Sequence, residues 1–360
     1  MHDKHISFLN KAHKIAQEKF GTTFPNPVVG CIIVKNNKIV ASGVTASEGR
    51  PHAEEIALKK AGDRAMNSTM YVTLEPCFHN SRHGSCSEQI LRSGIKSVYI
   101  GRYDPDLRTN RKSIRKLKKN GLNVFSGLLE SKTDNLNHFF FHSLENKRPF
   151  IKVKMAISKD EKIAKFNYKS KWISNYKSRE YSHNLRLMSQ AILTTSRTII
   201  KDNPRFTVRK NGKIIKHLTT IIIDNLLKIP LDTNILKDIS KKRIIIFTSS
   251  VGKKSESLQK IGCEVILMKA KNNKQLNLKT IFKKLYELKI NDVFVEAGGI
   301  LFTEMIKQNL VDELHIFKSN KDIGKRGIPV LINGKISDLK THEISKKKFL
   351  NDQYSCYRFV

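Results

Sequence analysis

A histidine and two cysteines near the amino end of the chain have the residue types and the order of zinc ligands. His52 lies in the segment Pro51-His52-Ala53-Glu54, and Cys77 and Cys86 follow it along the chain. Zinc binds imidazole nitrogen and thiolate sulfur, and a catalytic zinc keeps three protein ligands and one open position for water. Glu54 is not needed as a ligand, so it is free to move protons. The pattern therefore predicts a hydrolytic zinc site.

The order H-x-E, P-C, C is typical of the zinc-dependent nucleobase deaminases. In that class zinc activates a water for attack on a ring carbon that bears an amine, and the glutamate acts as acid and base. Eight residues separate Cys77 from Cys86, which is longer than the short P-C-x-x-C form. This interval holds His79 and His83, which are either solvated loop residues or a further ligand. The alternative without a metal is a buried histidine and two unrelated cysteines. This alternative does not explain why all four residues of the motif occur in this order.

Local patterns predict the elements that must hold these ligands. An apolar-periodic run begins at His52 and predicts a helix, with Pro51 as its start signal. The apolar run 69–74 predicts a buried strand, so Cys77 would follow its carboxyl end, where ligand sites in open α/β sheets lie. A second helix is predicted from Cys86. Two helix N-termini directed at one metal would favour its thiolates.

The composition suggests a large soluble protein with more than one core. The chain has 360 residues, which is long for a single domain, and 39% of them are hydrophobic. The 67 Lys and Arg residues against 32 Asp and Glu give a net charge of +35, which raises nucleic acid as a partner. The basic residues are not gathered into one arm or stripe, however, so a general compositional drift is the favoured interpretation.

The number of cysteines and the hydropathy of the sequence indicate the cellular compartment of the protein. Five cysteines are too few for a disulfide framework, and Cys31, Cys263 and Cys356 are expected to pack in the interior. We find neither a signal peptide nor an apolar run long enough to span a bilayer. We therefore expect a cytoplasmic protein that has no membrane partner.

Strands and helices alternate throughout, which predicts two α/β domains separated by the polar segment 145–149. In the first domain, the predicted strands are 31–34, 38–43, 69–74, 97–101 and 122–125, and the predicted helices are 5–20, 52–58, 86–91, 112–120 and 130–144. In the second domain, the predicted strands are 150–156, 191–195, 219–224, 243–247, 264–267, 292–296, 313–317 and 353–359. Its predicted helices are 175–187, 279–288 and 301–309, and 210–216 is predicted to be an exposed charged loop.

The second domain has its own candidate ligand-binding residues. The strand before Glu296 runs into Gly298 and Gly299 and then into a helix, which would let backbone N–H groups approach a phosphate. No G-x-G-x-x-G fingerprint is present. The segment 198–209 offers arginines, an aspartate and hydroxyls on a loop, which suits a phosphorylated polar ligand. Trp172 lies beside hydroxyls and is either a core residue or part of this site.

Taken together, these motifs resemble the bifunctional deaminase/reductase family of riboflavin biosynthesis over nearly the full length of the chain. The similar motifs of the first half are Pro25-Asn26-Pro27, Val29-Gly30-Cys31, Pro51-His52-Ala53-Glu54, Leu74-Glu75-Pro76-Cys77, Cys86 and Asp104-Pro105. Those of the second half are Ser158-Lys159-Asp160, Ser170-Lys171-Trp172-Ile173, Leu185-Arg186, Thr198, Asp202-Asn203-Pro204, Arg209, Val295-Glu296-Ala297-Gly298 and Val311-Asp312-Glu313-Leu314.

The resemblance implies a cytidine-deaminase-like three-layer α/β/α domain over residues 1–145 and a dihydrofolate-reductase-like α/β domain over residues 150–360. It also implies two consecutive reactions. The first is hydrolytic deamination, at C2, of 2,5-diamino-6-(5-phosphoribosylamino)pyrimidin-4-one. In the second, NADPH delivers hydride to C1 of the ribose, which opens to a ribityl chain. The implied cofactors are Zn²⁺ and NADPH, and the implied partner is a phosphorylated pyrimidine of small size. We also expect a homo-oligomer.

The resemblance assigns roles residue by residue. Zinc is expected on His52, Cys77 and Cys86, with Glu54 as the proton shuttle and Asn26 as a substrate-binding residue of the deaminase. The implied substrate-binding positions of the reductase are Ser170, Arg186, Phe206, Arg209 and Glu296. The implied NADPH-binding positions are Ile157, Trp172, Thr198, Asp202, Asn225, Gly298 and Gly299.

Some positions depart from the family pattern. Arg111 and Ser113 stand where glycines are common, and His83-Gly84-Ser85 replaces Thr-Pro-Pro before the last cysteine. Ser319-Asn320-Lys321 stands in place of Ala-Pro-Lys. Glu161 replaces a glycine near the expected nicotinamide pocket, where it could weaken the reductase.

Two rival functions remain open from the sequence. One is a base deaminase that acts on tRNA or single-stranded nucleic acid and has an accessory domain, an idea that the net charge encourages. The other is a zinc-stabilised regulatory protein that binds a nucleotide. A closed metal site with His79 or His83 as the fourth ligand would support this second rival.

Overall fold

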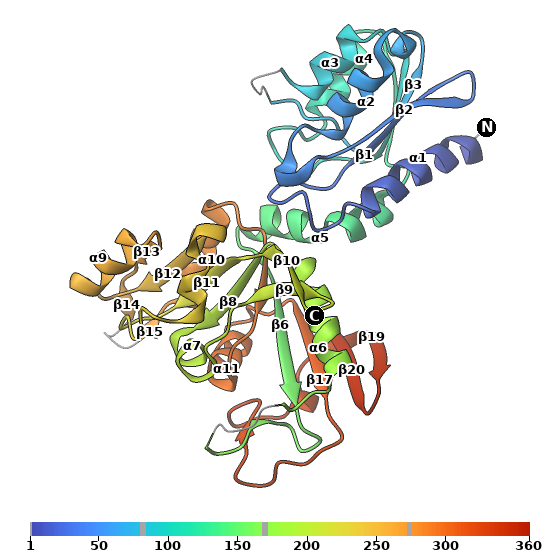
Figure 1. Cartoon of the computed structure of the whole chain (residues 1–360). Helices are drawn as coiled ribbons and strands as arrows, with labels where there is room; N and C mark the ends of the chain where they lie inside the picture. Colours follow the sequence, from blue (N-terminus) through green and yellow to red (C-terminus); the bar gives the residue numbers. More distant parts are fainter. Residues whose placement is uncertain (1, 80–83, 168–171, 272–274) are drawn as a thin grey trace. The chain divides into compact units, whose positions relative to one another are not determined.

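The computed structural model describes residues 2–79, 84–167, 172–271 and 275–360. The chain divides into two compact units, Met1–Lys147 and Arg148–Val360, and each is built around its own sheet (Figure 1). Within the described residues, we find no helix whose length and hydrophobicity would let it cross a bilayer.

The first unit contains a five-stranded sheet with the order β2-β1-β3-β4-β5. β1 pairs antiparallel with both β2 and β3, whereas β3, β4 and β5 run parallel. The carboxyl ends of the three parallel strands therefore meet at one edge. The strands are β1 (Gly30–Lys35), β2 (Lys38–Val44), β3 (Thr69–Leu74), β4 (Ser97–Arg102) and β5 (Asn123–Ser126).

Helices cover both faces of this sheet, which confirms the predicted three layers (Figure 1). One face carries α1 (His2–Gln17) and α5 (Glu130–Asn146). The other carries α2 (Ala53–Ala61), α3 (Cys86–Arg92) and α4 (Lys112–Lys119), and the short 3₁₀ helices η1 (Ser47–Gly49) and η2 (Gly62–Ala65) flank α2.

Two glycines allow the helices to approach the sheet closely. A Cβ atom on Gly30 would lie 1.9 Å from the Ala12 carbonyl oxygen, and one on Gly43 would lie 2.1 Å from the Ala53 carbonyl oxygen. Both neighbours are backbone atoms, so a side chain at either position would push α1 or α2 away from the sheet. Because α2 carries Glu54 and begins beside His52, the packing at Gly43 also fixes the site.

The second unit contains a nine-stranded sheet with the order β13-β12-β11-β8-β16-β6-β17-β20-β19. The strands from β13 to β17 in this order are parallel, and β20 is antiparallel to its neighbours β17 and β19. The strands are β6 (Phe150–Ile157), β8 (Ala191–Thr195), β11 (Thr219–Ile223), β12 (Ile244–Thr248), β13 (Glu264–Leu267), β16 (Asp292–Val295), β17 (Glu313–Lys318), β19 (Thr341–Phe349) and β20 (Asp352–Phe359).

Helices pack on both faces of the larger sheet and bury its apolar residues. The core of one face includes residues of α6 (Tyr176–Leu187), α7 (Ser196–Asp202), α8 (Asn234–Lys237) and α9 (Lys253–Lys260). The core of the other face includes residues of α10 (Leu278–Glu287) and α11 (Gly299–Lys307). The prediction of an α/β fold is confirmed for this unit as well.

Several elements of the second unit were not predicted. The segment expected to be an exposed loop forms a hairpin of β9 (Thr207–Lys210) and β10 (Lys213–His217). Its turn residues Asn211 and Gly212 both have positive φ, which is the conformation that a two-residue hairpin turn requires. The remaining short elements are β7 (Lys162–Ala164), β14 (Ala270–Lys271), β15 (Gln275–Leu276), β18 (Ile328–Pro329), η3 (Ile239–Lys241) and η4 (Ile336–Asp338).

Candidate active sites

The structure brings the three predicted zinc ligands together. His52 is the N-cap residue of α2, Cys86 is the first residue of α3, and Cys77 follows the carboxyl end of β3. The His52 Nδ1 and Cys86 Sγ atoms are 3.3 Å apart, and the Cys86 amide donates to Cys77 Sγ at 3.3 Å. The three potential ligand atoms all lie within 4.8 Å of one another.

The chemistry of this donor set fits zinc. One imidazole and two thiols form a recurring ligand set of catalytic zinc sites. Both cysteines are buried, with Cys86 completely inaccessible. Hydrogen bonds from the Cys86 thiol and the His52 ring lower the pKa of Cys77 to about 4, while the Cys77 thiolate and burial raise the pKa of Cys86. A bound cation would favour the thiolate form of both sulfurs.

The described residues leave one tetrahedral position without a protein ligand. Within these residues, the group has the three members His52, Cys77 and Cys86. The His79 ring nitrogen Nδ1 instead lies 3.5 Å from the Thr109 hydroxyl, which is at the outer limit of a hydrogen bond. His83 is outside the residues that the structure describes.

Glu54 lies in the first turn of α2, beside the three donors, and only 3% of its surface is exposed. Burial, partly offset by the neighbouring His52 ring, raises the pKa of the Glu54 carboxyl to about 7. A carboxyl group with a pKa near neutrality can accept and donate protons in one catalytic cycle.

Asn26 is hydrogen-bonded to the chain segment that leads to His52. Its side-chain amide donates to the Gly49 carbonyl oxygen at 2.8 Å, three residues before the histidine. Gly49 has a φ of +87°, and a Cβ there would lie 2.7 Å from atoms of Asn26. The contact therefore needs glycine at this position, both for its backbone angle and for the close approach.

Glu75 is a site residue to which the sequence had given no role. Its buried carboxylate accepts three hydrogen bonds, from the Ser113 hydroxyl (2.7 Å), the Arg111 amide (3.0 Å) and the Asp104 amide (3.3 Å). These bonds anchor both ends of the loop between β4 and α4. The same loop carries Thr109, whose hydroxyl accepts from the Phe78 amide next to Cys77. The only sequence signal was an acidic residue directly after a buried strand.

In the second unit, candidate residues gather at the carboxyl ends of the parallel strands, where open α/β sheets bind ligands. Ile157 ends β6, Asn225 follows β11, and Glu296 follows β16. Thr198 and Asp202 belong to α7, directly after β8, so the prediction that they lie on a loop is wrong. The Thr195 hydroxyl accepts from the Thr198 amide and starts this helix.

A partly buried ion pair joins two of the predicted substrate-binding residues. Arg186 Nε and Nη2 donate to the two Glu296 carboxylate oxygens at 2.5 and 2.9 Å. Burial would raise the pKa of Glu296, but the charges of Arg186 and Lys154 hold it at about 2. The Arg186 guanidinium also lies 5.7 Å from the centre of the Phe206 ring.

Arg209 joins this group through Thr207 and His183. Its Nε donates to the Thr207 hydroxyl at 3.2 Å, and its amide donates to His183 Nδ1 at 3.2 Å. Arg186 Nη1 donates to the Thr207 carbonyl, so both arginines meet at one residue. Thr207 belongs to the segment 198–209 that the sequence marked as a candidate, whereas Lys154 and His183 were not singled out. The sequence did offer one indication for Lys154, because a charged residue is unusual within the apolar run that forms β6.

The other predicted cofactor-binding residues have contrasting surroundings. Gly298 is the N-cap residue of α11, and a Cβ on Gly299 would lie 2.7 Å from the Val330 carbonyl oxygen. Trp172 is 66% exposed and stacks on the Arg179 guanidinium at 4.3 Å, which excludes the core interpretation. Ser170 lies outside the described residues.

A second group of potential metal ligands, Glu313, His315 and Cys356, is buried between β17 and β20. The Glu313 carboxylate already pairs with Arg358 at 2.5 Å, and His315 Nδ1 lies 2.9 Å from the Tyr354 hydroxyl. Burial raises the pKa of Cys356 to about 12. These contacts indicate a structural ion pair in the core.

Comparison with known proteins decides the family. The zinc-binding region of cytidine and deoxycytidylate deaminases matches residues 2–102, and the RibD C-terminal domain matches residues 149–352. The riboflavin biosynthesis protein RibD of Aquifex aeolicus is 36% identical over 345 residues, which cover 96% of this chain and 95% of that protein. The chain belongs to the RibD family. RibD of Escherichia coli is 31% identical, with 90% of each protein covered.

Solved RibD structures have the same fold along the whole chain. A RibD of Acinetobacter baumannii superposes with a TM-score of 0.89 at 26% identity and full coverage of both chains. A Thermotoga maritima structure, described as a diaminohydroxyphosphoribosylaminopyrimidine deaminase/5-amino-6-(5-phosphoribosylamino)uracil reductase, gives 0.84 at 30% identity and covers 100% and 99% of the two chains. The first unit is therefore cytidine-deaminase-like and the second is the RibD reductase domain, with the dihydrofolate-reductase-like fold.

The chain is thus a bifunctional enzyme of riboflavin biosynthesis, with a zinc-dependent deaminase and an NADPH-dependent reductase. The predicted family, fold, activities and cofactors are confirmed. The roles of the individual residues remain predictions.

We predict that Glu75→Ala lowers kcat/KM for deamination by about tenfold or more, because the β4–α4 loop loses its anchor and misplaced groups slow catalysis. Zinc content should remain that of the wild type, and amides of residues 104–113 should exchange faster with deuterium. Glu75→Gln keeps one acceptor oxygen and should retain more activity.

Alanine at the exposed Glu130 of the same unit is the matched control. Wild-type activity together with wild-type amide exchange in Glu75→Ala would contradict the positioning role.

Proposed function

We propose that the first unit hydrolyses the C2 amine of 2,5-diamino-6-(5-phosphoribosylamino)pyrimidin-4-one, and that the second unit reduces the ribose of the product to a ribityl chain. The observation that carries the proposal is the convergence of His52, Cys77 and Cys86 around one point, with the buried Glu54 beside them. The Thermotoga relative, whose description names both activities, supports the choice of substrate. We assign residues 1–145 to the deaminase and residues 150–360 to the reductase.

In the deaminase, His52, Cys77 and Cys86 would hold the zinc ion, which supplies a Lewis acid that makes water nucleophilic near neutral pH. Glu54 would take a proton from the attacking water and return it to the ring nitrogen and the departing amine. Water and the amino compound are thereby converted to a carbonyl and ammonia. Asn26, which is tied to the chain before His52, would orient the pyrimidine.

In the reductase, Arg186, Phe206, Arg209 and Glu296 would bind the sugar phosphate, and Ser170 would join them. The Arg186–Glu296 pair keeps the guanidinium fixed, and Arg209 supplies a second planar fork suited to a phosphate group. NADPH supplies the hydride, and the protein orients the sugar against it. The proposed cofactor-binding residues are Ile157, Trp172, Thr198, Asp202, Asn225, Gly298 and Gly299.

Glu161 departs from the family pattern, but its carboxylate has local partners. Its Oε2 accepts from the Ile336 amide at 3.4 Å, and its Oε1 lies 3.8 Å from the Lys318 ammonium. Glu161 has a φ of +61°, which explains why glycine is common there. We propose that the reductase remains active, because these contacts partly balance the charge of Glu161.

We propose a small-molecule substrate rather than a nucleic acid, because the second unit carries a reductase fold that base deamination does not need. A deaminase acting on tRNA is therefore not favoured. The homo-oligomer stays a prediction.

We predict that Glu54→Gln retains zinc but loses nearly all ammonia release, because the amide cannot carry the proton. Deamination should fall by about a hundredfold or more, the usual effect of losing a general acid–base group. The measurement is ammonia release from the diaminopyrimidine ribosyl phosphate, with zinc content determined in parallel.

The adjacent Glu55, which pairs with Arg50 at 3.2 Å, provides the control variant Glu55→Gln. Substantial turnover by Glu54→Gln would refute the assigned role.

We predict that Arg209→Ala and Asp202→Asn spare deamination but lower NADPH oxidation by about tenfold or more, because charge-assisted bonds to substrate and cofactor are lost. Both activities can be followed in one cuvette, through ammonia and the absorbance of NADPH. Lys210→Ala changes the neighbouring exposed residue, whose side chain alternates to the other face of β9, and should affect neither activity.

Loss of both activities together in Arg209→Ala would argue against two independent sites.

A further inference from the structure

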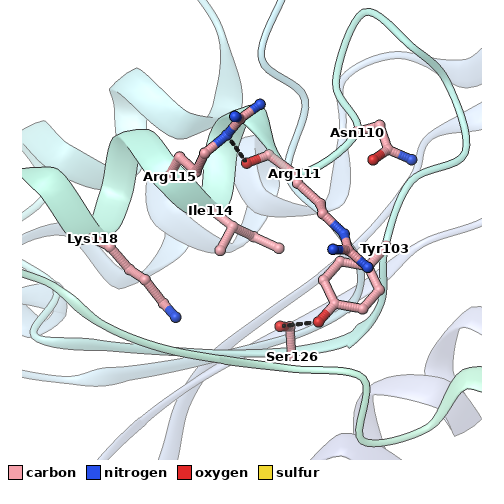
Figure 2. A pocket seen from close by; sticks show the side chains of 7 residues that line it. All are labelled: Tyr103, Asn110, Arg111, Ile114, Arg115, Lys118 and Ser126. Atoms are coloured by element: carbon pink, nitrogen blue, oxygen red, sulfur yellow. Dashed lines mark hydrogen bonds between the residues drawn. The ribbon is translucent and has the colours of Figure 1, made fainter.

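A pocket of 430 Å³ lies in the first unit, outside the residues assigned to the zinc site (Figure 2). It is lined by Tyr103, Asn110, Arg111, Ile114, Arg115, Lys118 and Ser126. These residues come from the end of β4, the following loop, one side of α4 and the end of β5. The pocket therefore opens at the carboxyl edge of parallel strands, the usual place for ligands in α/β sheets.

The lining is strongly cationic. Arg115 and Lys118 lie on one side of α4, and Arg111 directly precedes this helix. All three line the same pocket. None of the pocket-lining residues is acidic. Like charges at such spacing repel one another, and α4 itself contains no acidic residue that could offset them. An anionic ligand would relieve this repulsion.

Some other cations of the unit have carboxylate partners. Lys116, on another side of α4, binds Glu88 at 2.8 Å, and Arg102 binds Asp134. Within the described residues, by contrast, the side chains of Arg111, Arg115 and Lys118 form no ion pair. Three cations that form no ion pair therefore lie close together at the pocket.

The pocket arginines have defined positions. The Arg111 guanidinium lies over the Tyr103 ring at 4.7 Å, and Arg115 Nε donates to the Arg111 carbonyl oxygen at 3.3 Å (Figure 2). The Ser126 hydroxyl donates to the Tyr103 hydroxyl at 3.0 Å, so this side of the pocket is polar as well (Figure 2). Guanidinium groups, hydroxyls and an amide side chain together suit a phosphate group, whose oxygens accept several hydrogen bonds at once.

We propose that this pocket binds the phosphate group of a small phosphate ester. Its volume of 430 Å³ is within the range of small-molecule pockets, which is about 300–1,000 Å³. Ile114 is the only aliphatic residue of the lining, so an apolar ligand would gain little there. A nucleic acid strand would need a continuous basic track, whereas this is a single concavity. The proposal goes beyond the two reactions and does not rest on them.

The test uses the zinc-loaded, full-length protein labelled with ¹⁵N-arginine. Inorganic phosphate is titrated at constant ionic strength while the Nε–H signals of Arg111 and Arg115 are followed by NMR. We expect saturable shifts at these two residues. Shifts that spread over all arginines without saturation would overturn the proposal, because they would report only the net charge of the protein.

Paired variants separate the pocket from the general charge. Arg115→Ala/Lys118→Ala should weaken phosphate binding, observed at Arg111, by about tenfold or more, the loss expected for a charge-assisted hydrogen bond. Lys112→Ala/Lys119→Ala removes the same charge from exposed positions of α4 outside the pocket and should bind nearly as well as the wild type. Equal weakening in both variants would overturn the proposal.

A second arm identifies the source of the phosphate. A raised KM for deamination in Arg115→Ala/Lys118→Ala, with kcat unchanged, would show that the pocket holds the phosphate of the substrate itself. An unchanged KM beside lost phosphate binding would show a separate ester, and either result supports the site. Shifts at Arg111 and Arg115 with an RNA oligonucleotide but not with inorganic phosphate would contradict the proposal.

Discussion

The first unit depends on one constraint: the Cys77 and Cys86 sulfurs and an imidazole nitrogen of His52 must lie close enough together to bind one metal ion. These groups come from three separate segments, and ordering them in a buried place has a cost that a bound cation can offset. The fold meets the constraint with three element boundaries: the start of α2 at His52, the start of α3 at Cys86 and the chain after β3 at Cys77. Glycines at the contacts of α1 and α2 with the sheet allow the required close packing. Glu54 is placed by the same helix that begins at His52.

The two units use the same edge of a parallel sheet for different chemistry. In the first unit, the edge holds a metal-ligand set and a buried carboxyl group whose pKa is raised by burial. In the second, it holds an arginine–glutamate pair whose carboxyl pKa is lowered by cations. Glu54 is buried and Glu296 is partly buried, so neighbouring charge decides the direction of the shift. The cationic pocket beside α4 extends the ligand-binding edge of the first unit to β5.

Much of this architecture was predictable from local patterns. Apolar runs marked the central strands, and the residues around His52 and Cys77 marked a helix start and a strand end. Local patterns could not predict the features that depend on contacts between residues distant in sequence. The three bonds to Glu75 come from residues that are 29, 36 and 38 positions away in the sequence. The cationic pocket combines segments from Tyr103 to Ser126. The β9–β10 hairpin and the edge strand β19 were not predicted. These strands carry many exposed charged residues, so their sequences lack the alternation of apolar and polar residues that indicates a strand. The sequence could not decide whether Trp172 lies in the core or at a binding site, because its stacking on Arg179 at the surface is a contact that the sequence pattern does not show.

The most direct measurement of the central claim is X-ray absorption spectroscopy at the zinc edge on the purified, active protein. We expect one zinc per chain, bound by two sulfurs at about 2.3 Å, one imidazole nitrogen and one oxygen from water. A protein that contains no zinc, or a zinc enclosed by four protein ligands, would contradict a hydrolytic metal site at His52, Cys77 and Cys86.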